Sequence, residues 1–125
     1  MGRCIVLEQD GTRCEHEAYD IDAFLLSHPA GVYTVGRTLR GRRAVVELAH
    51  HEQRLLASLR AKGLWPAAGD DAPVRTALRD AWRRTIEAAR GCFGAEDELR
   101  LTALVVAADA AAARVVLATM AEALP

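Results

Sequence analysis

His51 and Arg54 are the residues whose types and spacing favour chemistry most strongly in this sequence. They stand three positions apart in a segment with helical periodicity, so their side chains lie close together on one helix face. The guanidinium of Arg54 can donate two hydrogen bonds to a phosphate and stays charged at any working pH. The structural alternatives are an arginine on a solvated helix face and a histidine that only packs within the domain.

A second candidate set follows the periodicity of a strand. Residues 31–39, GVYTVGRTL, are rich in β-branched and aromatic types, which favours an extended segment. A period of two places Tyr33, Val35 and Arg37 on one face and the alternate residues on the other. An aromatic side chain, a small apolar side chain and a cation therefore line up, either over a binding site or with Arg37 at the rim of a sheet core.

Two helices are expected to position these residues. Leucines at helical spacing predict a helix over residues 47–62, with Gly63 at its C-terminal cap. A second helix is predicted over residues 73–90, because Pro73 suits a first helical turn and one continuous apolar face ends before Gly91.

The remaining segments favour strands. We expect hairpins from residues 4–8 with 13–17 and from 31–39 with 42–48, and strands over 99–107 and 114–119. Residues 22–27 are a short strand or a connector. This order predicts a single α+β domain over residues 1–125, with an antiparallel sheet of about four to six strands packed by two helices in two layers.

Composition narrows the classes of function. The 16 basic and 17 acidic residues give a net charge of −1, which provides no overall field for nucleic acid. No apolar run is long enough for a membrane span or a signal peptide, so we expect a soluble intracellular protein. Cys4, Cys14 and Cys92 show no CxxC spacing and are expected as reduced thiols of unassigned role. Cys14 with a nearby histidine, or the pair at positions 50 and 51, follows no metal-ligand motif, so no metal site is predicted.

The stretch from residue 31 to residue 58 resembles the N-terminal domain of the fold-type IV, or class IV, pyridoxal-phosphate (PLP) enzymes. That group includes branched-chain and D-amino-acid aminotransferases and aminodeoxychorismate lyase. Its pattern is a strand G-V-[FY]-E-x-x-R, a turn with glycine, a second strand and a helix with H-x-x-R-L. Thr34 stands where the common pattern has glutamate, which is more similar to a plant-type branch. The matching residues are Gly31, Val32, Tyr33, Arg37, Gly41, His51, Arg54, Leu55 and Ser58.

The resemblance implies roles for the candidate residues. Arg54 would bind the phosphate of PLP, with a smaller role for His51, and the face bearing Tyr33, Val35 and Arg37 would line the substrate side of the cofactor. An aromatic wall and a cation suit the side chain and the carboxylate of an amino acid. The complete enzyme would transfer amino groups between an amino acid and a 2-oxo acid, and would form a homodimer.

The resemblance also implies that half of the site is missing. PLP chemistry needs a lysine amine, which the family takes from its second domain. The sole lysine, Lys62, lies where the family has no catalytic lysine. We therefore expect no catalytic residue in this chain, no activity of the chain alone, and an apolar surface at Trp65 and on the Tyr33 face that the second domain would cover.

Three accounts stay open on the sequence. The chain is the N-terminal portion of a transaminase or lyase, a free-standing relic that binds a partner or a phosphate compound without catalysis, or an unrelated α+β interaction domain.

Overall fold

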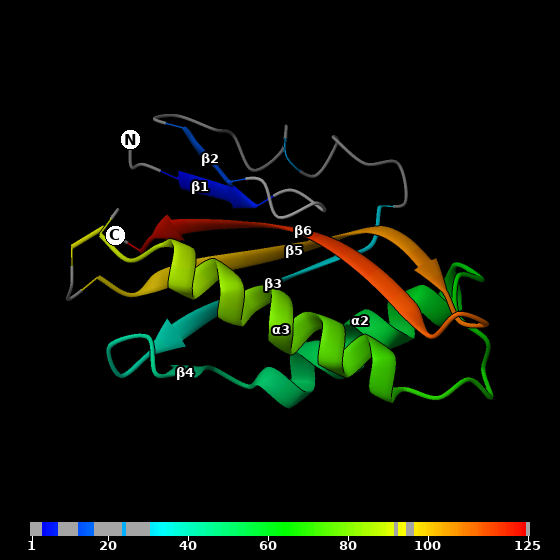
Figure 1. Cartoon of the computed structure of the whole chain (residues 1–125). Coiled ribbons are helices and arrows are strands. Elements are labelled where there is room, and N and C mark those ends of the chain that lie inside the picture. The colour runs from blue at the N-terminus through cyan, green and yellow to red at the C-terminus, as the bar shows by residue number, and fades with distance from the viewer. Residues whose placement is uncertain are drawn as a thin grey trace.

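A computed structural model of the chain describes residues 4–7, 13–16, 24, 31–91, 93–94 and 97–124, with the first two segments as backbone only. The described strands form one antiparallel sheet in the order β2-β1-β6-β5-β3-β4, and two helices lie against it (Figure 1). The predicted α+β architecture is confirmed. The strands are β1 (Cys4–Leu7), β2 (Arg13–His16), β3 (Tyr33–Leu39), β4 (Ala44–Val45), β5 (Leu99–Asp109) and β6 (Arg114–Ala123), and the helices are α2 (Leu48–Ala61) and α3 (Ala72–Ala88).

The hairpin of β5 and β6 forms the centre of the sheet. The two strands pair from Leu99 opposite Ala123 to Asp109 opposite Arg114, with an irregularity between Val105 and Ala107. Their β-branched and apolar residues are buried on both faces over much of this length, as expected for central strands. The two predicted strands are confirmed, and both extend beyond their predicted C-terminal ends.

Local sequence sets the helix boundaries. The backbone of Glu47 is left-handed, with φ of 52°, and α2 begins directly after it. Gly63 follows the C-cap of α2 with φ of 71°, a conformation that glycine adopts without strain. Pro73 lies in the first turn of α3, where its missing N–H costs no helical hydrogen bond. Both predicted helices are confirmed to within two residues at each end.

A buried ion cluster fixes α2 against α3. The carboxylate of Glu52 on α2 is fully buried and accepts hydrogen bonds from Arg75 and Arg79 on α3. The distance from Arg75 Nη1 to Glu52 Oε1 is 3.2 Å. A buried carboxylate is tolerated when it is paired in this way, so the cluster determines how α2 sits beside the sheet.

The core has two parts, one on each face of the sheet. The larger part lies between the helices and the sheet, and its largest side chains are Trp65 and Trp82. The smaller part, on the opposite face, contains Phe24, Leu104, Ala118 and Met120.

The prediction that Trp65 lies on an exposed apolar surface is wrong. Its side chain is 3% exposed and packs in the larger core, where the indole N–H donates to the carbonyl oxygen of Asp70 at 3.0 Å. The loop from α2 to α3 folds back over its own tryptophan, a contact that helical or strand periodicity cannot indicate. Tyr33, the other expected site of exposed apolar surface, is 48% exposed.

Three further predicted segments differ in detail. The second strand of the 31–48 hairpin is only the two-residue β4, because the left-handed Glu47 ends the extended backbone and starts α2. The N-terminal hairpin is confirmed for β1 and β2, while the predicted ends at residues 8 and 17 lie outside the described part. Phe24, the described residue of 22–27, is helical and not extended.

Candidate functional site

The residues singled out from the sequence gather around β3. This strand pairs with β5 over Tyr33–Arg37, and on its other side β4 pairs only with Thr38 and Leu39. No described strand therefore pairs with the outer edge of β3 from Tyr33 to Gly36. In Figure 1, α2 lies close to β3, and the two elements are in contact.

His51 lies between α2 and the helix-covered face of β3. Its Nδ1 is 3.0 Å from the hydroxyl oxygen of Thr34, which is buried. Its ring packs edge-on against Trp82, with centroids 5.6 Å apart. Burial, followed by the positive charges of His50 and Arg54, lowers the pKa of His51, while Glu47 opposes this shift. A neutral imidazole that orients α2 on β3 is therefore its structural role.

Arg54 stands one helical turn after His51 and is exposed. Within the described residues, its guanidinium makes no hydrogen bond or ion pair. The arginines of the buried cluster differ, because Arg75 and Arg79 are bound to Glu52. Arg54 thus has its donors free for an external phosphate or carboxylate.

Tyr33, Val35 and Arg37 share one face of β3, as the strand period predicted. Tyr33 and Arg37 are exposed and Val35 is half-buried, whereas the alternate residues are buried beneath the helices. Arg37 lies directly opposite Arg100 of β5, whose Nη1 is 3.2 Å from Glu122 Oε1. This face therefore offers an aromatic side chain at one end and two arginines at the other.

The two predicted sets do not form one closed pocket in this chain. His51 contacts β3 from the helix-covered side, while Tyr33, Val35 and Arg37 point to the opposite side. No described hydrogen bond or ion pair joins Arg54 to any of these three residues.

Other chemistry has little support among the described residues. Lys62 forms the C-cap of α2, eight residues after Arg54, which is about 12 Å along the helix axis. No cluster of three or more His, Cys, Asp or Glu side chains with metal-binding geometry occurs in the described part of the chain. None of the described helices has the length and hydropathy needed to cross a bilayer.

Solved aminotransferase structures share this fold. A hypothetical aminotransferase from Mycobacterium tuberculosis matches in its PLP-bound form with a TM-score of 0.61 and 19% identity, and in its apo form with 0.59 and 18%. An aminotransferase from Brucella abortus bound to PLP matches with a TM-score of 0.55 and 19% identity. The matches cover 98% of this chain but only 40% to 43% of the other chains. No protein-family model and no curated protein matches the chain.

The chain thus has an aminotransferase-like fold and spans about two fifths of the length of those structures. At sequence identities of 18% to 19% the similarity shows the fold alone. The roles of individual residues depend on the geometry of the site in this chain.

Sequence reasoning missed two features near the site. One is the position of the Trp82 ring, which packs against His51 and fills the space that a Cβ atom at Gly36 would need. The other is the row of arginines on α3 that faces the β3–β4 hairpin. The helical spacing of Arg79, Arg83 and Arg90 was the available signal for the second feature.

Proposed function

We propose that this chain is the N-terminal, cofactor-phosphate half of a class IV PLP-dependent aminotransferase related to the D-amino-acid and branched-chain enzymes. The observation that carries the proposal is the exposed guanidinium of Arg54, which makes no hydrogen bond or ion pair among the described residues. It lies one helical turn after His51, whose ring contacts Thr34 of β3. The fold shared with PLP-bound aminotransferases supports the proposal.

In this proposal Arg54 binds the phosphate of PLP. Its guanidinium is exposed and unpaired among the described residues, so a phosphate gains two charge-assisted hydrogen bonds without breaking an existing ion pair. His51 holds α2 against β3 through Thr34 and thereby positions Arg54. The residues present therefore fit the phosphate group of the cofactor.

The face of β3 contacts the substrate in the same proposal. Tyr33 and Val35 supply an apolar wall, and Arg37 supplies a cation for a carboxylate. Tyr33 and Arg37 are four residues apart, about 13 Å along the strand, so they serve different parts of the site. The substrates are an amino acid and a 2-oxo acid, and a homodimer is the proposed form of the complete enzyme.

The reaction needs a group that this chain does not contain. When bound, PLP withdraws electrons from the α-carbon of an amino acid so that the amino group can be exchanged. That chemistry requires a lysine amine beside the cofactor, and Lys62 lies about 12 Å from Arg54 along α2. We therefore propose that the amine comes from a second domain and that the chain alone catalyses no transamination.

A binding module without catalysis is the second candidate function. It is favoured by the combination of an unpaired Arg54 and a single lysine at the C-cap of α2. Both candidates predict phosphate recognition, and they differ in whether a lysine-bearing domain restores turnover.

The first experiment tests phosphate recognition by the chain as given. The probe is 4-deoxypyridoxine 5′-phosphate, which lacks the aldehyde and so cannot react with Lys62. In a two-dimensional ¹H–¹⁵N NMR titration, backbone amides of α2 around His51 and Arg54 and of β3 around Tyr33 should shift saturably. Unphosphorylated 4-deoxypyridoxine should bind at least tenfold more weakly. Equal binding of the two compounds, or the absence of saturable shifts in the α2 and β3 amides, would contradict the proposed site.

The second experiment separates the two functions. The chain is mixed with PLP, an amino acid and a 2-oxo acid, alone and with the lysine-bearing domain of a class IV aminotransferase supplied as a separate polypeptide. Turnover that requires both polypeptides supports the enzyme half. Phosphate binding without turnover in either mixture favours the binding module.

A further inference from the structure

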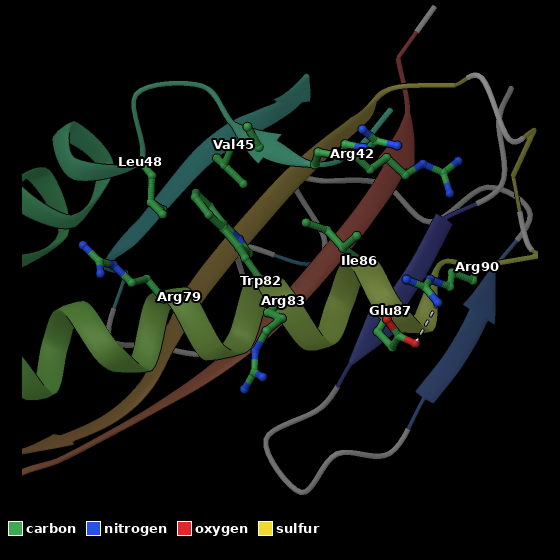
Figure 2. Close-up of a pocket in the computed structure, with 11 residues that line it drawn as sticks. Arg42, Val45, Leu48, Arg79, Trp82, Arg83, Ile86, Glu87 and Arg90 are labelled. Carbon is green, nitrogen blue, oxygen red and sulfur yellow. Dashed lines mark ion pairs between the residues drawn. The ribbon is translucent and has the colours of Figure 1, made fainter. Parts of the chain in front are cut away.

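A cavity of about 510 Å³ opens between α3 and the β3–β4 hairpin (Figure 2), and Arg54 is not among the residues that line it. Its volume falls within the range of about 300 to 1,000 Å³ that is typical of small-molecule sites. A second cavity of about 530 Å³ adjoins it and shares Arg42, Arg43, Ile86 and Arg90 with it. The two together form a groove along α3 that ends at Phe93, and we call this groove the α3 groove.

The floor of the α3 groove is apolar. Figure 2 shows Trp82 and Ile86 of α3 facing Val45 and Leu48 across the cavity. Trp82 is 1% exposed, and its indole N–H finds no hydrogen-bond acceptor. Buried polar groups without partners are uncommon in folded proteins. The N–H is itself buried, so the lining that the cavity offers a ligand at Trp82 is apolar contact and not this donor.

The rim of the groove is cationic. The cavity lined by Trp82 carries five arginines and one glutamate, and the arginines are Arg42, Arg43, Arg79, Arg83 and Arg90.

Only part of this positive charge is neutralised within the described chain. Glu52 pairs with Arg79, while Arg83 pairs with Asp80 and Arg90 pairs with Glu87 at exposed positions, where ion pairs contribute little. Arg42 donates to the carbonyl oxygens of Gly94 and Asp97, which carry no net charge.

Arg43 is the clearest sign of an external ligand. It is exposed beside the cavity, and its guanidinium has no hydrogen bond or ion pair among the described residues. An apolar floor below several planar cations suits a ligand with an apolar ring and a doubly charged group.

We propose that the α3 groove binds a small aromatic phosphate monoester, with the ring on Trp82, Ile86 and Val45 and the phosphate on Arg43 and Arg83. The site contains neither Arg54 nor any residue of the Tyr33 face. It is therefore separate from the proposed cofactor site and does not depend on the proposed function.

The test is an NMR titration of the full chain with 1-naphthyl phosphate. The sequence has two tryptophans, and Trp65→Phe assigns their indole N–H signals. The Trp82 signal should move saturably, while the Trp65 signal, whose N–H is already bonded to Asp70, should stay in place. Neutral 1-naphthol and inorganic phosphate should each bind at least tenfold more weakly than 1-naphthyl phosphate.

Matched double variants show whether the arginines at the rim bind the phosphate. Arg43→Ala with Arg83→Ala should weaken 1-naphthyl phosphate at least tenfold. Arg84→Ala with Arg114→Ala removes the same charge from exposed arginines outside the cavity and should change the affinity less than twofold.

Three outcomes would overturn the proposal. Equal affinity for inorganic phosphate would mean that the arginines bind anions without the apolar floor. Equal affinity for 1-naphthol would mean an apolar groove without anion recognition. A loss that is the same in both double variants, or no movement of the Trp82 signal, would mean that general charge or another surface binds the probe.

Discussion

Gly36→Ala tests the packing that holds α2 against β3. Gly36 is buried, and a Cβ atom there would stand 3.0 Å from Cη2 and 3.3 Å from Cζ3 of Trp82, and 3.3 Å from Nε2 of His51. Its φ is not in the left-handed region, so alanine is allowed by the backbone. The limited space beside Trp82 and His51, and not the backbone conformation, therefore disfavours a larger side chain at this position.

The expected magnitude follows from two opposing effects. Forcing a methyl group into a packed core costs about 1 to 3 kcal/mol. Replacing glycine reduces the entropy of the unfolded chain and returns about 0.4 to 1 kcal/mol. We expect Gly36→Ala to lower the free energy of unfolding by about 1 to 2 kcal/mol, measured by urea denaturation followed by circular dichroism.

A double-mutant cycle shows whether the clash is the cause. Trp82→Phe removes the outer ring atoms that the new methyl group would meet. In that background Gly36→Ala should cost less by about 1 kcal/mol, because the contact no longer exists. A neutral or stabilising Gly36→Ala in the wild-type background, or the same cost in both backgrounds, would refute the packing of β3, His51 and Trp82 described here.

Three other predictions concern the stability of the folded chain. Arg79→Ala combined with Arg75→Ala should cost about 3 to 5 kcal/mol in urea denaturation, because Glu52 then keeps a buried charge without a partner, and a loss below 1 kcal/mol would contradict its burial. Because the folded-state pKa of His51 lies below 6.5, its contribution to stability is present above that pH and is lost as the pH falls through the folded-state pKa. His51→Asn should remove this part of the pH dependence in unfolding curves between pH 8 and 4, and an unchanged profile would contradict it. Arg37→Glu should raise the free energy of unfolding by about 0.2 to 1 kcal/mol, because it places opposite charges across β3 and β5, and a loss of stability would contradict this pairing.

The sequence was sufficient for the architecture because the main signals are local. The leucines of α2 and the apolar face of α3 repeat with helical spacing, and Gly63 and Pro73 mark helix ends. The alternation in β3 placed Tyr33, Val35 and Arg37 on one face, which the structure shows to be the more exposed one. Each of these features depends on residues within one segment.

Features that depend on distant parts of the chain were not predictable from the pattern. Trp65 is buried by its own loop and Glu52 by two arginines on another helix, although a loop position and a glutamate side chain each favour exposure. Tertiary contacts of this kind decide burial. For the same reason the sequence placed His51 near Arg54 but gave no sign of its contact with Thr34.

The affinity of Arg54 variants for 4-deoxypyridoxine 5′-phosphate tests the central claim most directly. Arg54→Ala should weaken binding by about ten- to a hundredfold, equivalent to about 1.5 to 3 kcal/mol for a lost charge-assisted contact. Arg54→Lys should recover only part of this, since an ammonium group cannot donate the paired hydrogen bonds of a guanidinium. The control is Arg114→Ala, which removes an exposed arginine at the start of β6. An unchanged dissociation constant in Arg54→Ala, with the wild-type chain binding the compound, would contradict the assignment of Arg54 as the phosphate-binding residue and with it the cofactor site on α2.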